Sequence, residues 1–424
     1  MLDYIKLLLK SKWSVKNIIL LILTVSVCVF IHVLIMHDLV KFVDSVSSAI
    51  SFNNRQIEKQ EIFKSPKYIL LWYGSALVSP SEGNAVLKHL HCPVTDCIFT
   101  TNKHLLGNIS NFNAIVFNEN FLKSKRVIKP KVRSNSQIYT LNTVESAHNY
   151  PACELFLDDF FNWTFTYRLA SDIVWSYITV TDVEGHIIAP SKSVVWRHSS
   201  APVKPEIRSI LAGKTKAAAW LVSNCNADSL RDEYVTRLQE HLFHFSLAID
   251  IYGSCTGTKC TRGDCEEMVK EQYYFYMAFE NSFAEDYVTE KVLHGYNNYA
   301  VPIVYGGANY SRFLPPGSYI NAREMHPYRL ALKIRQVISN RNLFMSYFTW
   351  TNLYKVTTSE VKVQHPLCHF CEALHSNRVQ KAPAMKNFRF WWNGLNGMKW
   401  CLSNEYWSER NKMIIDSKDV YPLY

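Results

Sequence analysis

The chain has 424 residues, more than one hydrophobic core usually holds, so its length predicts two domains. Its 48% apolar and 14% aromatic content is typical of a folded globular protein and excludes a disordered one. The net charge of +10 suits an anionic ligand such as a nucleotide diphosphate. Without a basic motif or a run of like charges, it does not indicate a nucleic-acid partner.

The first predicted element is a transmembrane helix over residues 18–36. This uncharged run is long enough, at ~1.5 Å per residue, to cross a ~30 Å hydrocarbon core. Lysines precede it at Lys6, Lys10, Lys12 and Lys16. They predict that residues 1–17 form a cytosolic tail and that the rest of the chain is lumenal, as in a single-pass type II membrane protein. A cleavable signal peptide is the alternative, but the run exceeds its usual ~7–15 apolar residues.

Residues 37–65 are polar and thinly patterned, and we interpret them as a stem. The chain has 11 cysteines, and apart from Cys28 in the span they would be lumenal, where disulfides are favoured. The three glycosylation sequons fit a lumenal location and begin at Asn108, Asn162 and Asn309.

Two α/β domains are predicted beyond the stem, over residues 66–200 and 201–365, with residues 366–424 as a C-terminal tail. In the first domain the predicted strands are 67–72, 114–117 and 137–141, and 172–180 alternates and then turns. Pro202 and Pro205 mark the linker. In the second domain, strands at 216–223, 247–252, 273–279 and 301–305 alternate with helices at 231–243 and 288–299. This alternation predicts a doubly wound parallel sheet.

Polar pairs follow three strands of the second domain: Ser223-Asn224, Glu280-Asn281 and Gly306-Gly307. Ligands of doubly wound sheets bind beyond the carboxyl ends of the strands. A helix that opens around Tyr287, with Glu290 and Lys291 in its first turns, would add a helix N-terminus and a cation for phosphate. The sequence therefore predicts a nucleotide site at this edge.

The same segment, from Phe275 to Lys291, resembles the donor-binding motif of the α1,3-fucosyltransferases of glycosyltransferase family ten. The matching residues are Phe279-Glu280-Asn281-Ser282, a short gap, and Tyr287-Val288-Thr289-Glu290-Lys291. The resemblance extends over about residues 68–405. It implies the GT-B fold, in which two Rossmann-like domains face a cleft, and a Golgi type II membrane enzyme that transfers fucose from GDP-fucose.

A second block resembles the acceptor side of that family, where a Glu before a Ser-Pro pair is the catalytic base. The resemblance assigns this role to Glu145, although Ala147 stands here in place of the proline. Transfer with inversion needs such a carboxylate, because the acceptor hydroxyl loses its proton as the glycosidic bond forms. A solvated loop carboxylate is the alternative interpretation.

The resemblance also assigns the donor contacts. Arg231 and Lys291 would bind the diphosphate and Glu290 the ribose hydroxyls. Asn281 and Tyr287 match donor-contacting positions, although Tyr287 is equally a candidate core anchor. Asn224 and Glu280 are weaker candidates.

The pair Cys368 and Cys371 is open to a zinc or a disulfide interpretation, with Cys92 and Cys97 as partners in either. The family resemblance implies disulfides from Cys92 and Cys97 to Cys368 and Cys371, which would clamp the tail to the first domain. The sequence leaves the other pairs open.

We therefore expect an inverting fucosyltransferase that forms an α1,3 linkage to GlcNAc of core or antennary N-glycans or related glycans. A non-catalytic GDP-fucose- or glycan-binding protein and a transferase for another nucleotide sugar are the alternatives. No Asp-x-Asp metal motif occurs in a strand context, so no metal site is expected and no cofactor beyond the donor is required. Stimulation by Mn²⁺ or Mg²⁺, the acceptor and homodimer formation are left open.

Overall fold

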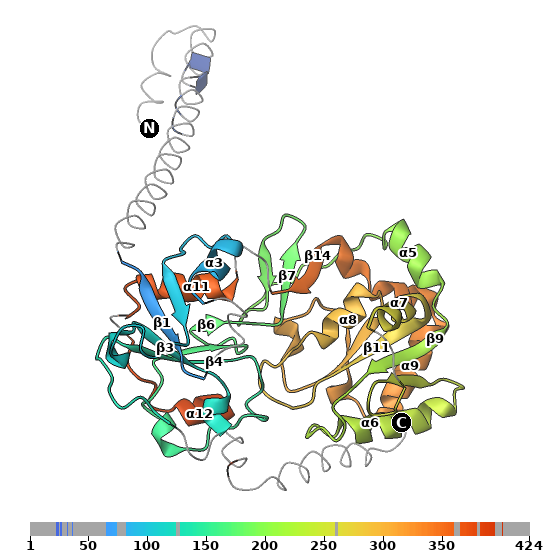
Figure 1. Ribbon diagram of the computed structural model, residues 1–424. Helices are drawn as coiled ribbons and strands as arrows, with labels where there is room; N and C mark the ends of the chain where they lie inside the picture. Colours follow the sequence, from blue (N-terminus) through green and yellow to red (C-terminus); the bar gives the residue numbers. More distant parts are fainter. Residues whose placement is uncertain are drawn as a thin grey trace, which may run out of the picture. The chain divides into compact units, whose positions relative to one another are not determined.

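Figure 1 shows the computed structural model of the protein. The structure describes residues 65–73, 82–123, 128–258, 262–359, 365–379, 382–394 and 401, together with isolated positions between 23 and 36. The predicted tail, anchor and stem therefore lie almost wholly outside the described residues. Within the described ranges, no helix is both long and apolar enough to cross a bilayer. The chain from Pro66 onward forms one compact unit.

The first sheet is parallel throughout, with the strand order β2-β1-β3-β4-β5-β6. Its strands are β1 (Lys67–Leu71), β2 (Cys97–Thr100), β3 (Ala114–Phe117), β4 (Ile138–Thr143), β5 (Trp163–Thr166) and β6 (Ile173–Val174). Every residue of β3, β4 and β5 is buried, as expected for parallel strands that are covered on both faces.

The second sheet is also parallel and has the order β10-β9-β11-β12-β13. Its strands are β9 (Lys216–Leu221), β10 (Ile249–Tyr252), β11 (Tyr273–Phe279), β12 (Val301–Tyr305) and β13 (Ile320–Asn321). The order reverses between β9 and β11, which makes their carboxyl ends the switch point of the sheet. Two parallel α/β sheets were predicted, and both are present.

A third, antiparallel sheet has the order β14-β7-β8 and consists of β7 (Ile178–Asp182), β8 (Ile187–Ala189) and β14 (Tyr354–Thr358). The described helices are α3 (Ala85–His89), α4 (Asn120–Lys123), α5 (Pro205–Ala212), α6 (Arg231–Phe243), α7 (Arg262–Gln272), α8 (Lys291–Asn297), α9 (Pro327–Ser339), α10 (Arg341–Ser346), α11 (Pro366–His375) and α12 (Phe388–Asn393). Helix α6 follows the predicted bounds and buries Tyr234, Leu238 and Leu242, which share one helical face.

The C-terminal helices pack against the first sheet rather than the second (Figure 1). Disulfides join Cys92 to Cys368 and Cys97 to Cys371, the cysteines for which the family resemblance implied such bonds. Both bonds link α11 to the segment around β2. Because each closes a loop of more than 270 residues, they restrict the unfolded chain strongly.

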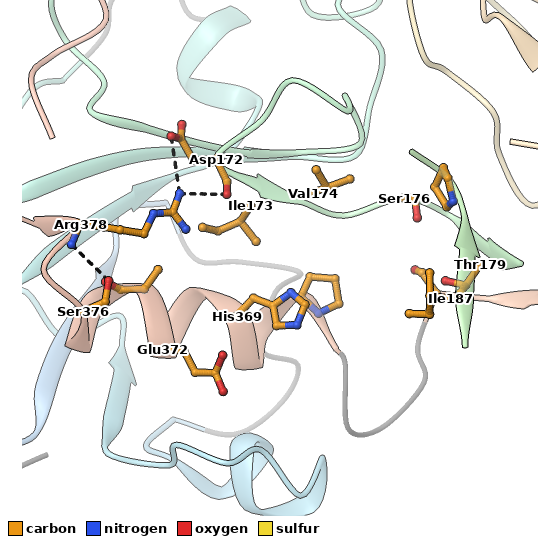
Figure 2. Close-up of a pocket in the computed structure, with 14 residues that line it drawn as sticks. Asp172, Ile173, Val174, Ser176, Thr179, Ile187, His369, Glu372, Ser376 and Arg378 are labelled. Carbon is orange, nitrogen blue, oxygen red and sulfur yellow. Dashed lines mark hydrogen bonds and ion pairs between the residues drawn. The ribbon is translucent and has the colours of Figure 1, made fainter. Parts of the chain in front are cut away.

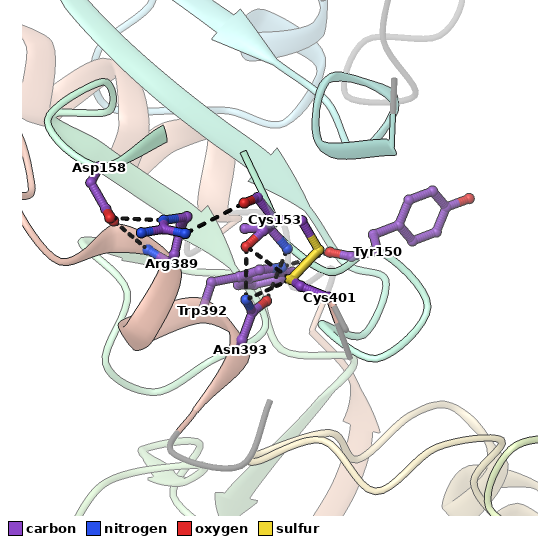
Figure 3. The surroundings of a disulfide bond; sticks show 8 residues. Tyr150, Cys153, Asp158, Arg389, Trp392, Asn393 and Cys401 are labelled. Carbon is purple, nitrogen blue, oxygen red and sulfur yellow. Dashed lines mark hydrogen bonds and ion pairs between the residues drawn. A yellow bond between two sulfur atoms is a disulfide. The ribbon is translucent and has the colours of Figure 1, made fainter. Parts of the chain in front are cut away.

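Helix α12 is fixed to the segment that follows β4 (Figure 3). The Asn393 side chain exchanges two hydrogen bonds with the Ala152 backbone, at 2.8 and 2.9 Å, and Trp392 Nε1 donates to the Tyr150 carbonyl at 2.8 Å. A disulfide joins Cys153 to Cys401 beside them. A further disulfide, Cys225–Cys255, and the pairing of Cys153 could not be read from the sequence.

Two predicted elements differ from the structure. The run 172–180 divides into β6 and β7, which belong to different sheets, because the chain leaves the first sheet after Val174 and pairs with β14. The predicted helix 288–299 begins only at Lys291. Asp286 has a positive φ of 61°, and the Thr289 N–H donates to the Glu280 carboxylate, so the preceding residues form a loop instead of a helical turn.

Lys214 lies between α5 and β9 and is buried against the ends of two helices. Its ammonium donates to the Val269 carbonyl in the last turn of α7, at 3.2 Å, and to the Asn298 carbonyl at the end of α8, at 3.0 Å. A cation is favoured at helix C-termini. Burial nevertheless lowers the pKa of Lys214 to about 7, with a smaller contribution from Lys270.

We predict that this lysine makes stability depend on pH. Its folded pKa lies below the unfolded value of 10.5, so between about pH 7 and 10.5 the unfolded chain binds more protons and stability rises with pH. The contribution is at most about 1.4 kcal/mol per pH unit. Denaturant unfolding at pH 7, 8 and 9 should show that the free energy of unfolding of the parent rises with pH relative to that of Lys214→Met, which lacks the titrating group. Parallel curves for the two proteins would contradict the assignment.

Candidate functional site

The carboxyl ends of β9 and β11 are held together by a buried arginine. Arg231, the first residue of α6, donates from Nη1 to the Phe279 carbonyl and from Nη2 to the Asn224 carbonyl, both at 2.7 Å. Burial lowers the pKa of its guanidinium. The predicted diphosphate contact therefore lies at the switch point, but two backbone carbonyls already engage it. Its Nε is buried without a hydrogen-bond partner among the described residues.

Asn224 and Asn281 occupy the two strand ends that Arg231 joins. Asn224 is exposed beside the Cys225–Cys255 disulfide. The Asn281 carbonyl accepts a hydrogen bond from the Ser229 N–H at 3.2 Å, while its side-chain Oδ1 is buried without a partner in the described part of the chain. An unpaired buried amide oxygen has a desolvation cost that a bound ligand with a donor group would relieve.

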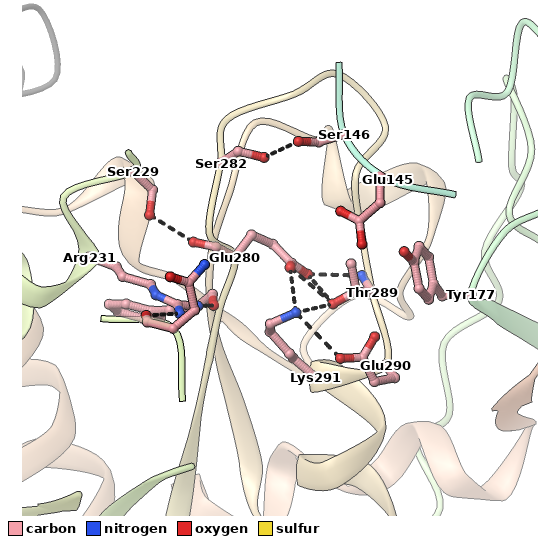
Figure 4. A network of polar contacts seen from close by, with 12 residues as sticks. Glu145, Ser146, Tyr177, Ser229, Arg231, Glu280, Ser282, Thr289, Glu290 and Lys291 are labelled. Atoms are coloured by element: carbon pink, nitrogen blue, oxygen red, sulfur yellow. Dashed lines mark hydrogen bonds and ion pairs between the residues drawn. The ribbon is translucent and has the colours of Figure 1, made fainter. Parts of the chain in front are cut away.

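Glu280 lies beneath this edge, and its carboxylate binds other side chains and backbone of the protein (Figure 4). Its side chain is 1% exposed and accepts hydrogen bonds from the Thr289 N–H at 2.8 Å and from the Thr289 hydroxyl at 2.9 Å. It also forms an ion pair with Lys291 at 3.1 Å. The buried carboxylate thus shapes the turn before α8 and leaves no face open to a ligand, so we interpret Glu280 as a support for Lys291.

Lys291 carries the cationic charge at the start of α8. Its ammonium donates to the Thr289 hydroxyl at 2.7 Å and lies 3.4 Å from the Glu290 carboxylate. Burial alone would lower the pKa of Lys291, but the carboxylates of Glu280 and Glu290 outweigh burial and raise it. The lysine is therefore charged at neutral pH and suits a phosphate oxygen.

Tyr287 is a core residue of the first domain, although it lies in a segment of the second. It is buried, with its ring 5.0 Å from that of Tyr167 and 6.1 Å from that of Tyr177. Burial raises its pKa well above the ordinary tyrosine range. We call residues 280–290 the donor loop. Tyr287 anchors this loop to the first sheet, which is the core interpretation that the sequence left open.

Glu145 reaches the donor loop from the first sheet. It lies in residues 144–149, which we call the base loop, directly after β4. Figure 4 shows its carboxylate beside Tyr177 and facing Thr289 and Glu290. The Tyr177 hydroxyl donates to the Val144 carbonyl at 2.7 Å, and Asn149 Nδ2 lies 3.4 Å from Glu145 Oε2. The predicted base and the predicted donor contacts therefore meet at one site.

The departure from the family pattern at Ala147 has a structural counterpart. The Ala147 N–H donates to the Tyr167 hydroxyl at 3.3 Å, and a proline has no N–H with which to form this bond. The base loop is thus fixed by a hydrogen bond where the family has a rigid ring.

Sequence reasoning missed several supporting residues. Thr289 is part of the quoted motif, but only its contact with Glu280 shows what it does. Tyr167 lies in the block that resembles the family's acceptor side, but the sequence assigned no role to it or to Tyr177. Arg168 contacts Glu285 of the donor loop and the Trp391 carbonyl in α12. These contacts depend on tertiary packing.

The three sequons differ in their surroundings. Asn108 and Asn309 are exposed, and their side-chain oxygens accept hydrogen bonds within their own turns, from Ser110 and Ser311. The Asn162 amide instead donates to the Ala382 carbonyl at 2.8 Å and accepts from the Tyr139 N–H at 2.8 Å. Asn162 is therefore more enclosed than the other two sequon asparagines.

Two clusters of potential metal ligands occur among the described residues, and neither includes a predicted catalytic or donor-binding residue. One contains Cys97 and Cys371, whose sulfurs form a disulfide. The other, Asp182, Glu184 and His186, is a surface turn in which Asp182 accepts from the backbone of the other two. A separate cavity of about 550 Å³ lies between β6 and α11, where Asp172 pairs with Arg378 (Figure 2). The predicted donor residues do not line it.

We predict that the two carboxylates around Lys291 differ in their contribution to stability. Glu280→Gln should lower the free energy of unfolding by about 2 kcal/mol, because it leaves a partly buried ammonium and the Thr289 N–H without a charged acceptor. Glu290→Gln should change it by less than about 0.5 kcal/mol, since that side chain is 51% exposed. Denaturant unfolding measures both, and equal losses would contradict this assignment.

The two parallel sheets, a switch point with a buried arginine and a charged lysine before a helix define a nucleotide-binding α/β protein. Two family models match it: the fucosyltransferase N-terminal model over residues 64–178 and the C-terminal model of glycosyltransferase family 10 (fucosyltransferase) over residues 211–391.

Two relatives from Drosophila melanogaster agree with this family. The chain is 35% identical over 360 residues to alpha-(1,3)-fucosyltransferase C of Drosophila melanogaster. The alignment covers 79% of this chain and 80% of that protein. It is 30% identical to glycoprotein 3-alpha-L-fucosyltransferase A of the same organism, over 83% of this chain and 65% of that protein. A crystal structure of alpha1,3-fucosyltransferase with GDP-fucose is similar at 15% identity and a TM-score of 0.44, over 74% of this chain and 91% of that chain. The chain belongs to glycosyltransferase family 10 and is a fucosyltransferase.

Proposed function

We propose that this protein transfers L-fucose from GDP-β-L-fucose, with inversion and in α1,3 linkage, to GlcNAc of an N-glycan or a related glycan. Burial raises the pKa of Tyr177, and the observation that carries the proposal is that Glu145 and Glu290, next to Lys291, both lie close enough to Tyr177 to raise it further (Figure 4). Glu145 can remove a proton and Lys291 can stabilise a departing diphosphate. A protein that only stored the nucleotide sugar would not need the carboxylate.

The proposed step is a single displacement. The acceptor hydroxyl attacks the anomeric carbon of fucose while Glu145 takes its proton, and the bond from that carbon to the phosphate oxygen breaks. GDP departs with the bonding electron pair. Lys291, held charged by Glu280 and Glu290, stabilises the added negative charge.

The residues present fit a bound GDP moiety. The Asn281 Oδ1 and Arg231 Nε atoms are buried without partners in the described ranges, at the switch point where a nucleotide would bind. Glu290 is exposed next to Lys291 and is the carboxylate best placed to accept from ribose hydroxyls. The proposal assigns no step to a metal. Whether Mn²⁺ or Mg²⁺ stimulates fucose transfer is measured by adding either ion to the chelator-treated enzyme.

The cellular setting is part of the proposal. Residues 18–36 would anchor the chain in the Golgi membrane with the catalytic part in the lumen. The disulfides agree with an oxidising compartment. Two domains that face a cleft, as in GT-B enzymes, would place the acceptor on the Glu145 side and the donor on the Lys291 side.

We predict that Glu145→Gln lowers kcat for fucose transfer by at least ~10²-fold, because the amide cannot accept the proton. The full-length chain would be assayed with GDP-fucose and a panel of core, antennary and free lactosamine acceptors. The panel also identifies the acceptor. Glu154→Gln, an exposed carboxylate of the same domain, should be as active as the parent. Undiminished transfer by Glu145→Gln would exclude Glu145 as the base.

We also predict that Lys291→Met weakens binding of GDP by about 10- to 100-fold, the range for a lost charge-assisted hydrogen bond. Calorimetric titration with GDP measures this without an acceptor. Lys355→Met, which removes an exposed lysine on β14, should bind GDP like the parent. Equal affinities for all three proteins would show that Lys291 does not contact the diphosphate.

A further inference from the structure

One buried hydrogen bond joins the base loop directly to the donor loop. The Ser282 hydroxyl donates to the Ser146 hydroxyl at 2.8 Å, and both residues are fully buried. Ser146 follows the proposed base in sequence, and Ser282 follows the pair Glu280-Asn281. The two serines are 136 positions apart in the chain and lie in loops that follow strands of different sheets. The bond therefore links two catalytic segments that backbone pairing does not connect.

The base loop is held from both sides. Tyrosines of the first domain contact it at two points, through the Val144 carbonyl and the Ala147 N–H. The second domain contacts it through Ser282 and through Asp228, which lies 2.9 Å from His148. Two of the contacts fixing the loop thus come from the half of the molecule that is proposed to bind the donor.

The donor loop is itself immobilised against the first domain. Asp286 accepts a hydrogen bond from the Leu169 N–H at 3.1 Å, and Glu285 pairs with Arg168. Ala284 and Tyr287 belong to the apolar core beneath the first sheet. Because the donor loop is anchored in this way, a residue that is hydrogen-bonded to it is held at a fixed position relative to the first domain.

We propose that the Ser282–Ser146 hydrogen bond is a positioning contact for fucose transfer, which sets the Glu145 carboxylate at a fixed place relative to Lys291. This inference rests on the proposed function, because it takes Glu145 as the base. In a single displacement, the attacking oxygen and the departing phosphate lie on opposite sides of the anomeric carbon. The proton acceptor and the cation must therefore hold a fixed separation, and an error of ~1 Å is enough to cost ~10²-fold in rate.

The chemistry of the pair supports this role. Two hydroxyls at fully buried positions have a desolvation cost that one shared hydrogen bond only partly offsets, and packing alone would accept alanine at both positions. Ser146 Oγ also accepts from the Asn149 N–H at 3.2 Å, and the Asn149 side chain approaches Glu145 Oε2. Ser282 thus acts on the carboxylate through a short chain of contacts within the base loop.

The test is a double-mutant cycle on the full-length enzyme, comparing the parent, Ser282→Ala, Glu145→Gln and the double variant. For Ser282→Ala we expect kcat to fall about 10-fold or more, while KM for GDP-fucose and Kd for GDP change by less than about 2-fold. In the Glu145→Gln background the same substitution should cause no further loss, because no base is left to position.

Ser318→Ala is the matched control. Ser318 is also buried and bonds to the Tyr296 hydroxyl and the Pro315 carbonyl, away from the site, so kcat should match that of the parent. Should Ser282→Ala fail to fold, Ser146→Ala enters the same cycle and removes the acceptor instead.

The outcomes separate two failures. If Glu145→Gln transfers fucose like the parent, the proposed function of that residue is wrong. If Glu145→Gln is impaired but Ser282→Ala retains full kcat, or lowers kcat equally in both backgrounds, only the positioning proposal is overturned. A rise in Kd for GDP as large as the loss in kcat also overturns it, because the serine would then act on donor binding.

Discussion

The site depends on the docking of the donor loop into the core of the first domain. The loop leaves β11, which belongs to the second sheet, yet Ala284 and Tyr287 are buried with the aromatic side chains of the first. Burial of a side chain such as Tyr287 is worth a few kcal/mol and is not directional, so it holds the loop without defining its register. Hydrogen bonds from Leu169 and Ser282 supply the register.

The electrostatics of the site follow from that docking. Because the loop turns back before α8, the Glu280 carboxylate reaches Thr289 and Lys291 in a nearly dry environment. A buried carboxylate is costly unless it is paired and hydrogen-bonded, and here three donor groups satisfy it. The same pairing keeps the lysine charged. One buried acid therefore shapes the turn, delays the helix to Lys291 and keeps the Lys291 ammonium charged.

The disulfides and the C-terminal helices stabilise the opposite side of the base loop. Helix α12 bonds to Tyr150 and Ala152, directly after the loop ends, and the Cys153–Cys401 bond joins the same segment to the end of the described chain. Helix α11 is linked to β2 by two further bonds. Helices α11 and α12 thus complete the first domain, although the second domain intervenes in the sequence.

The sequence by itself determined the elements with strong local patterns and the family. Residues 231–243 and 273–279 carry a clear helical period and a continuous apolar run, and these patterns set α6 and β11 whatever packs around them. The quoted motif likewise placed Glu290 and Lys291 at the start of a helix, because their spacing is local, while their roles toward the donor belong to the proposal. Only the tertiary structure decided how Glu280, Tyr287 and Arg231 are used. The local sequence around a Glu, a Tyr or an Arg does not show whether its side chain contacts a ligand or a buried partner in the protein. The difference lies in which distant segments pack against them, and local patterns do not encode that.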